Sequence, residues 1–182
     1  MFIETERLIL RPFTEEDLPS LAALYADPVV MRYYPQTYNV DETQERLNIT
    51  LEAYKSVGYH LLATILKAEN KFIGRCGIVR QTVESEQLPE IGYMLDKDYW
   101  GKGYATEAAR ALRDFGFTNF DFGALYSLIR PINTPSQAVA GRMGMTLAKV
   151  VSYGGYEHNL NCITRDRWKQ LRPPLRTAAT TT

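Results

Sequence analysis

The sequence has 182 residues, 45% of them hydrophobic and 12% aromatic, which is enough for the core of one domain. Its 21 basic and 21 acidic residues cancel, so we expect no nucleic-acid partner, because a nucleic-acid-binding face needs an excess of positive charge. We also expect no membrane partner, because no apolar run approaches the ~18–20 residues of a membrane span and the N-terminus lacks the basic-then-apolar order of a signal peptide.

The first half of the chain reads as a strand, two helices and two strands. Thr14 is a helix-capping residue, and the acids at positions 15–17 favour the positive end of a helix. Apolar residues then recur at helical spacing up to Tyr25. The expected elements are a strand over residues 8–13, a helix from Thr14 to Asp27, a helix from Asp41 to Gly58, and strands over 59–66 and 72–83.

The second half continues with alternating strands and helices. Thr134 fits the N-cap of a helix, with Pro135 at its first position and Gln137 closing a capping box. The expected elements are a polar link over residues 84–88, a strand over 90–95, a helix over 104–117, a strand over 124–130, a helix ending at Gly144, and strands over 150–152 and 160–164. We predict a single domain over residues 1–172 and a disordered tail over 173–182.

A glycine-rich loop, Tyr-Trp-Gly-Lys-Gly-Tyr-Ala-Thr at residues 99–106, lies between the strand at 90–95 and the helix that follows. Glycines before a helix expose its first N–H groups, which favour phosphate. The motif alone is equally consistent with a simple turn. A dinucleotide-binding loop is disfavoured, because Thr106 stands at its third glycine and Asp121 precedes the next strand instead of ending it.

The cysteines and histidines predict neither a disulfide nor a metal site. Cys76 and Cys162 are isolated, each within an expected strand, which indicates reduced thiols in a cytoplasmic protein. His60 and His158 are the two histidines of the chain, and no Cys/His cluster has the spacing of metal ligands.

Four further features of the sequence occur in a fixed order: residues 5–11, residues 90–108 with the loop described above, residues 133–136, and residues 163–168. Together these four segments resemble the GNAT acyltransferases, and more closely their RimJ/RimL-type branch of N-acetyltransferases. The resemblance covers about residues 3–168. It implies a mixed α/β (α+β) fold whose mostly antiparallel sheet is splayed between its fourth and fifth strands and is flanked by about four helices.

The resemblance implies that acetyl-CoA is the co-substrate and that the glycine loop holds its pyrophosphate. Trp100 stands where the family has Gln or Arg, while Gly103 and Ala105 fit the family pattern. Lys102 and Arg142 either approach a phosphate or are solvated surface charges. The cofactor-binding residues implied in this way are Tyr93, Met94, Leu95, Trp100, Gly101, Lys102, Gly103, Tyr104, Ala105, Thr106, Asn133, Ser136 and Arg142.

The implied chemistry is direct attack of a neutral amine on the acetyl thioester. The oxyanion needs a fixed N–H donor, which Met94 or Leu95 would supply. Ala140 stands where many family members have a tyrosine that protonates the leaving thiolate, so Ser136 is the substitute. Glu90 and Glu157 are equal candidates for the general base, with His158 behind them.

The resemblance leaves open the identity of the acceptor amine. It is a protein N-terminal α-amine or a small-molecule amine, and Tyr33, Tyr34 and Tyr38 with His158 are expected to line its pocket or, for the tyrosines, to belong to the core. The alternative is a catalytically silent module that binds acyl-CoA. The resemblance also leaves open whether the chain pairs as a homodimer.

Overall fold

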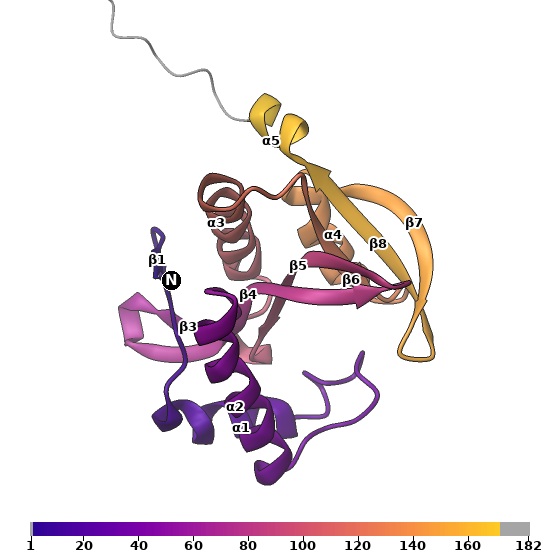
Figure 1. The fold of residues 1–182 in the computed structure, drawn as a ribbon. Helices are drawn as coiled ribbons and strands as arrows, with labels where there is room; N and C mark the ends of the chain where they lie inside the picture. Colours follow the sequence, from indigo (N-terminus) through magenta and orange to yellow (C-terminus); the bar gives the residue numbers. More distant parts are fainter. Residues whose placement is uncertain (1, 172–182) are drawn as a thin grey trace, which may run out of the picture.

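A computed structural model of the chain describes residues 2–171. Its strands form one sheet in the order β1-β2-β3-β4-β5-β6-β8-β7, in which neighbours are antiparallel except for the parallel pair β5–β6. The strands are β1 Ile3–Glu4, β2 Leu8–Arg11, β3 Leu61–Leu66, β4 Lys71–Val83, β5 Glu86–Leu95, β6 Ala124–Ile129, β7 Thr146–Tyr153 and β8 Tyr156–Thr164. The chain therefore has the mixed, mostly antiparallel sheet that the resemblance implies (Figure 1).

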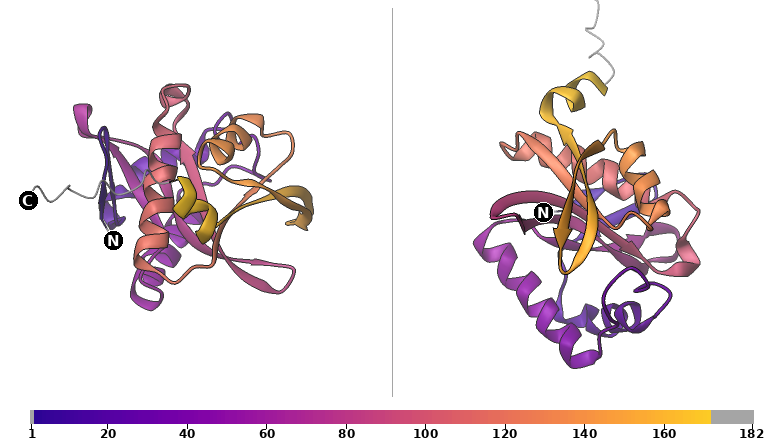
Figure 2. Two further views of the ribbon diagram at one scale, coloured as in Figure 1. Left: turned by 90° about the horizontal axis from the view of Figure 1, so that it is seen from above. Right: turned by 90° about the vertical axis from the view of Figure 1, so that its right-hand side faces the viewer.

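Helices cover both faces of this sheet, as the views in Figures 1 and 2 show. Helices α1 (Leu18–Ala26) and α2 (Val40–Ser56) pack on one face. Helices α3 (Tyr104–Asn119), α4 (Thr134–Arg142) and α5 (Arg165–Leu171) pack on the other. In each layer apolar side chains that are removed from water supply the main favourable free energy of packing.

Helix α3 lies close to the sheet because its inward face is small. Ala108, Ala109 and Leu112 are fully buried against the strands. A Cβ atom added at Gly116 would approach the side chain of Ile78 to 2.9 Å. These small residues place the first turn of α3, and the glycine loop before it, at the end of β5.

Several expected boundaries are wrong because their local signals were weak or ambiguous. The last two strands are β7 Thr146–Tyr153 and β8 Tyr156–Thr164 instead of 150–152 and 160–164, so Glu157 and His158 lie in a strand and not in a loop. The expected polar link over 84–88 is a two-residue turn, since β5 begins at Glu86, and Glu84 and Ser85 adopt positive φ values of 48° and 73° without a glycine. Asn133, not Thr134, is the N-cap of α4. The sequence also did not predict β1 or α5, which are short.

The expected tail over 173–182 lies outside the described residues, as does residue 172. Within residues 2–171 no helix is long and apolar enough to cross a membrane.

Candidate active site

The sheet forks between β5 and β6. The two strands share a single register pair, Glu90 with Tyr126. One residue further along β5, the Ser127 hydroxyl donates to the Ile91 carbonyl at 2.8 Å. Beyond this point the β6-facing edge of β5 has no strand partner, so its backbone groups are open to a ligand that binds as an extra strand.

The glycine loop lies where β5 ends. Gly101 and Gly103 have φ values of 74° and 83°, a left-handed conformation that side chains with a Cβ rarely adopt. Gly103 is the N-cap of α3, and the first N–H groups of that helix have no partner within it. Trp100 fixes the loop to the strand, because its indole N–H donates to the Leu95 carbonyl at 2.8 Å.

Three arginines surround the start of α3. Arg7 pairs with Glu107 at 2.6 Å and donates to the Lys102 carbonyl at 3.0 Å. Arg110 donates to the carbonyl of Arg142 at 3.0 Å, and all three arginines line the cavity described next. Positive charge beside exposed helix N–H groups is the arrangement that favours phosphate.

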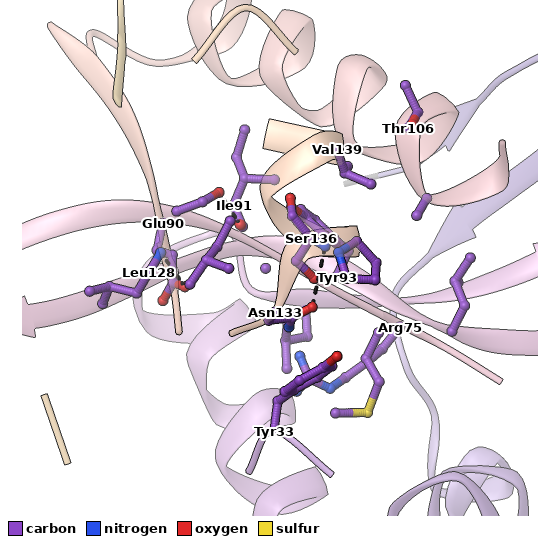
Figure 3. A pocket seen from close by; sticks show the side chains of 18 of the residues that line it. Tyr33, Arg75, Glu90, Ile91, Tyr93, Thr106, Leu128, Asn133, Ser136 and Val139 are labelled. Atoms are coloured by element: carbon purple, nitrogen blue, oxygen red, sulfur yellow. Dashed lines mark hydrogen bonds between the residues drawn. The ribbon is translucent and has the colours of Figure 1, made fainter. Parts of the chain in front are cut away.

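A cavity of about 1460 Å³ connects the fork with the glycine loop. Glu90, Ser136 and Thr106 line it from β5, α4 and α3, and Tyr33 reaches it from the loop between α1 and α2. Figure 3 shows Glu90 beside Leu128 at one end, Thr106 at the other, and Ser136 between them. The glycine loop, the open strand edge and a carboxylate therefore share one space.

The family model described as acetyltransferase (GNAT) domain matches residues 7–146 of this chain. The chain belongs to the GNAT acetyltransferase family. The protein YkkB of Bacillus subtilis is 39% identical over 148 residues, which cover 81% of this chain and 86% of the relative. N-acetyltransferase p20 of Bacillus licheniformis is 36% identical over 134 residues, 72% of this chain and 75% of the relative.

A solved structure described as RimL, a ribosomal L7/L12 α-N-protein acetyltransferase in complex with coenzyme A, has the same fold. It superposes with a TM-score of 0.75 at 22% identity, over 92% of this chain and 99% of that one. At this identity the likeness shows the fold alone. The chain is therefore a GNAT acyltransferase that uses acetyl-CoA, and the open edge of β5, the free N–H groups of α3 and the arginines beside them fit that co-substrate.

The Glu90 carboxylate lies at the apex of the fork. The Leu128 N–H of β6, which β5 leaves without a strand partner, approaches its Oε1 at 3.3 Å. Burial raises the pKa of Glu90 to about 7, although the Leu128 N–H and the charge of Arg75 act in the opposite direction. A carboxylate with a pKa near neutrality accepts a proton far more readily than an ordinary glutamate.

Tyr93 of β5 joins the two sides of the fork. Its hydroxyl donates to the Ser136 carbonyl at 2.8 Å, while the Ser136 N–H donates to Oδ1 of Asn133 at 3.3 Å. Burial raises the pKa of Tyr93 above its usual value, so the phenol keeps its proton and remains a donor. These two hydrogen bonds fix where Ser136 lies relative to β5 (Figure 3).

Tyr93→Phe removes the bond that crosses the fork and should lower the free energy of unfolding by about 1 kcal/mol. Urea unfolding of both proteins measures this difference. An unchanged midpoint would show that the Tyr93 hydroxyl does not hold α4 against β5.

The cavity brings most of the sequence-predicted site residues together. Those that line it are Tyr33, Tyr34, Glu90, Tyr93, Met94, Leu95, Trp100, Gly101, Gly103, Tyr104, Ala105, Thr106, Asn133, Ser136, Arg142 and His158. These residues come from five separate stretches of the chain, which only the folded sheet assembles.

Three predicted site residues do not line the cavity. Lys102 is exposed, with its ammonium 5.2 Å from the centre of the Tyr99 ring. Tyr38 packs edge-on against Tyr25 at 5.6 Å between ring centres, so it belongs to the core beneath α1. Glu157 is exposed because alternate residues of β8 point to opposite faces, and its neighbour His158 takes the side toward the cavity.

Sequence reasoning missed several polar residues of the cavity, among them Arg7, His60 and Arg75. Arg75 had a readable signal, because it is the one charged residue in the otherwise apolar stretch from Phe72 to Val79. His60 and Arg7 gave none, since their approach to the site depends on how β2, β3 and α3 pack.

Proposed function

We propose that this chain transfers an acetyl group directly from acetyl-CoA to a primary amine, with Glu90 as the general base. The observation that carries the proposal is the Glu90 carboxylate at the apex of the fork, beside the open edge of β5. Glu157 is exposed outside the cavity, which favours Glu90 between the two glutamates.

Acetyl-CoA supplies the thioester, whose carbonyl carbon gains a C–N bond to the amine and loses its C–S bond. Glu90 accepts the proton that the amine nitrogen must lose. The N–H groups of Met94 or Leu95, on the edge of β5 that lacks a strand partner, stabilise the oxyanion. Ser136 donates a proton to the departing sulfur, and its hydroxyl is restored through solvent.

Ser136→Ala should lower turnover by about 10²-fold or more, which is the lower range for lost general acid help. Acetyl-CoA affinity should stay within a few fold, because one hydroxyl contributes about 1 kcal/mol to binding. Steady-state rates at saturating acetyl-CoA, with thermal shifts for affinity, measure both. Unchanged turnover under conditions where chemistry limits the rate would remove Ser136 from the mechanism.

A catalytically silent module that binds acyl-CoA is the second candidate, and the presence of Ser136 and of the glycine loop argues against it. Incubation with acetyl-CoA and a panel of amines, with detection of free thiol, separates the two functions. Amine-dependent thiol release supports the enzyme. A rise in melting temperature with acetyl-CoA but no thiol release with any amine would support the silent module.

Membership of the RimJ/RimL branch is part of the proposal, supported by the sequence segments at residues 5–11, 90–108, 133–136 and 163–168 that resemble that branch. The cytoplasmic location and the homodimer stay predictions.

A further inference from the structure

Arg75 places a charge in the middle of the sheet. It lies on β4, where its register partners are Ala63 of β3 and Met94 of β5, both buried. A guanidinium stays protonated in proteins, so this site is cationic at every accessible pH. The side chain points into the cavity (Figure 3).

No carboxylate of the described chain neutralises Arg75. Within residues 2–171 it forms no ion pair, and its buried Nε has no hydrogen-bond partner. The Tyr25 ring lies 5.4 Å from the guanidinium, and the Tyr34 side chain interacts with it electrostatically. Arg75 as a whole is half-buried. Because charges that are removed from water are as a rule paired, a ligand that covers this cation is expected to bring an anion.

A second unpaired polar atom lies nearby. Nδ1 of His60 is buried without a hydrogen-bond partner among the described residues, and His60 lines the same cavity. Burial, and then the charge of Arg75, lower the pKa of His60 to about 4. The ring is therefore neutral near pH 7 and adds a polar group without a second charge.

Arg75 and Glu90 stand on one face of the sheet. Met94, Gly92 and Glu90 of β5 pair in register with Arg75, Gly77 and Val79 of β4. Because alternate residues share a face, the guanidinium and the carboxylate flank the glycine pair. A Cβ atom added at Gly92 would meet no atom within 4 Å, so the space beside Gly92 is open, whereas a Cβ atom at Gly77 would clash with the His60 carbonyl oxygen.

This spacing limits the size of the acceptor. Glu90 lies four residues along β5 from Met94, the register partner of Arg75, so Arg75 and Glu90 are offset by roughly 13 Å along the strands. The long side chains of both residues shorten that distance. The charge of Arg75 acts on the pKa of Glu90, which places the two groups within electrostatic reach. One short molecule with an amine at one end and an anion at the other matches this gap.

The charge balance of the cavity disfavours a polycationic acceptor. Arg32 lies over the ring of Trp100 in the glycine loop, and the basic lining residues away from that loop are Arg75, Arg80 and Arg130. Glu90 is the acid among them, whereas Glu6, Glu107 and Asp114 belong to the N-terminal segment and α3. A polyamine would meet like charges in this half of the cavity, which costs affinity.

We propose that Arg75 binds the carboxylate of an amino-acid acceptor whose α-amine faces Glu90. The inference rests on the proposed acetyl transfer and names its substrate class. Tyr33 and Tyr34, which also line this part of the cavity, would then contact the side chain of the amino acid.

The first test needs only the wild-type protein. Free amino acids are screened one by one with saturating acetyl-CoA, and kcat/KM is measured for the best of them, its C-terminal amide, its decarboxylated amine and spermidine. We expect the free amino acid to be preferred over its amide and its amine by about 10–100-fold, the range for a hydrogen bond between charged groups. Equal use of the three would overturn the inference.

Two substitutions assign that preference to Arg75. Arg75→Met keeps length without charge and should reduce kcat/KM for the amino acid by about 10–100-fold, while the decarboxylated amine stays within about threefold. Arg75→Lys should retain part of the preference. An unchanged acetyl-CoA thermal shift in both variants shows that the donor site is intact.

The remaining outcomes separate this inference from the proposed function. If Arg75→Met lowers kcat/KM equally for every acceptor, Arg75 does not recognise the carboxylate of the amino acid. The inference is then wrong, while the proposed acetyl transfer stands. If the wild-type protein prefers spermidine, the inference is likewise wrong. If no amine releases thiol, the proposed function and this inference both fail.

Discussion

Glu90→Gln is expected to lower turnover by about 10²–10⁴-fold near pH 7, which is the range for lost general base catalysis. Glutamine keeps the shape of the side chain and an oxygen for the Leu128 N–H, so the fork should remain assembled. The wild-type rate should rise with pH as Glu90 loses its proton around its pKa of about 7. The variant should lose this step and recover part of its activity at high pH, where the amine deprotonates unaided. Rates at saturating substrates from pH 5.5 to 10 measure both profiles.

Glu157→Gln is the matched control, because it makes the same chemical change at an exposed residue outside the cavity. Its pH profile should coincide with that of the wild-type protein. If the pH profile of Glu90→Gln runs parallel to that of the wild-type protein, Glu90 is not the general base. If instead the pH profile of Glu157→Gln is shifted, Glu157 is the general base.

Glu90→Gln should also change how the stability of the fold depends on pH. A carboxyl whose pKa is higher in the folded than in the unfolded state stabilises the fold below the unfolded pKa, and this contribution is lost as pH rises through the folded pKa. Wild-type stability should therefore fall between about pH 4.5 and pH 7 through Glu90. Glu90→Gln should lack this part of the fall and melt at a higher temperature than wild type at pH 8. Melting curves at pH 5 and pH 8 compare the two proteins, and the same dependence on pH in both would show that Glu90 is not buried as a charge.

Gly103→Val is expected to remove most of the rise in melting temperature that acetyl-CoA gives the wild-type protein. A ligand at 100 times its dissociation constant stabilises the fold by about 2.7 kcal/mol. Valine at a φ of 83° would strain the backbone and place two methyl groups where the pyrophosphate approaches. Thermal melts with and without acetyl-CoA measure the shift.

Gly58→Val separates loss of binding from backbone strain. Gly58 has a φ of 79°, and a Cβ atom added there meets nothing within 4 Å, so the strain is similar while the site is remote from the glycine loop. This control should melt lower than wild type, by an amount equivalent to about 1–3 kcal/mol, yet keep the full acetyl-CoA shift. A Gly103→Val protein with a normal shift would contradict the assignment of the loop to the pyrophosphate.

Several elements could be predicted from the sequence because their signals are local. The apolar periodicity of α3 and the glycines before it place the helix and the glycine loop within one continuous stretch. Helix caps and turns were harder to predict. Asn133 and Thr134 are both good capping residues, and the turn at Glu84–Ser85 contains no glycine.

The sequence by itself determined the strand and helix order, the glycine loop and, through its motifs, the resemblance to acetyltransferases. The tertiary structure alone decided which charged residues meet. The sequence does not distinguish Glu90 from Glu157 as the general base. In the folded sheet the side chain of Glu90 lines the cavity at the fork, while that of Glu157 is exposed to solvent. Arg75 became significant only when register set it on the face of Glu90, because pairing between strands fixes contacts that no local pattern encodes.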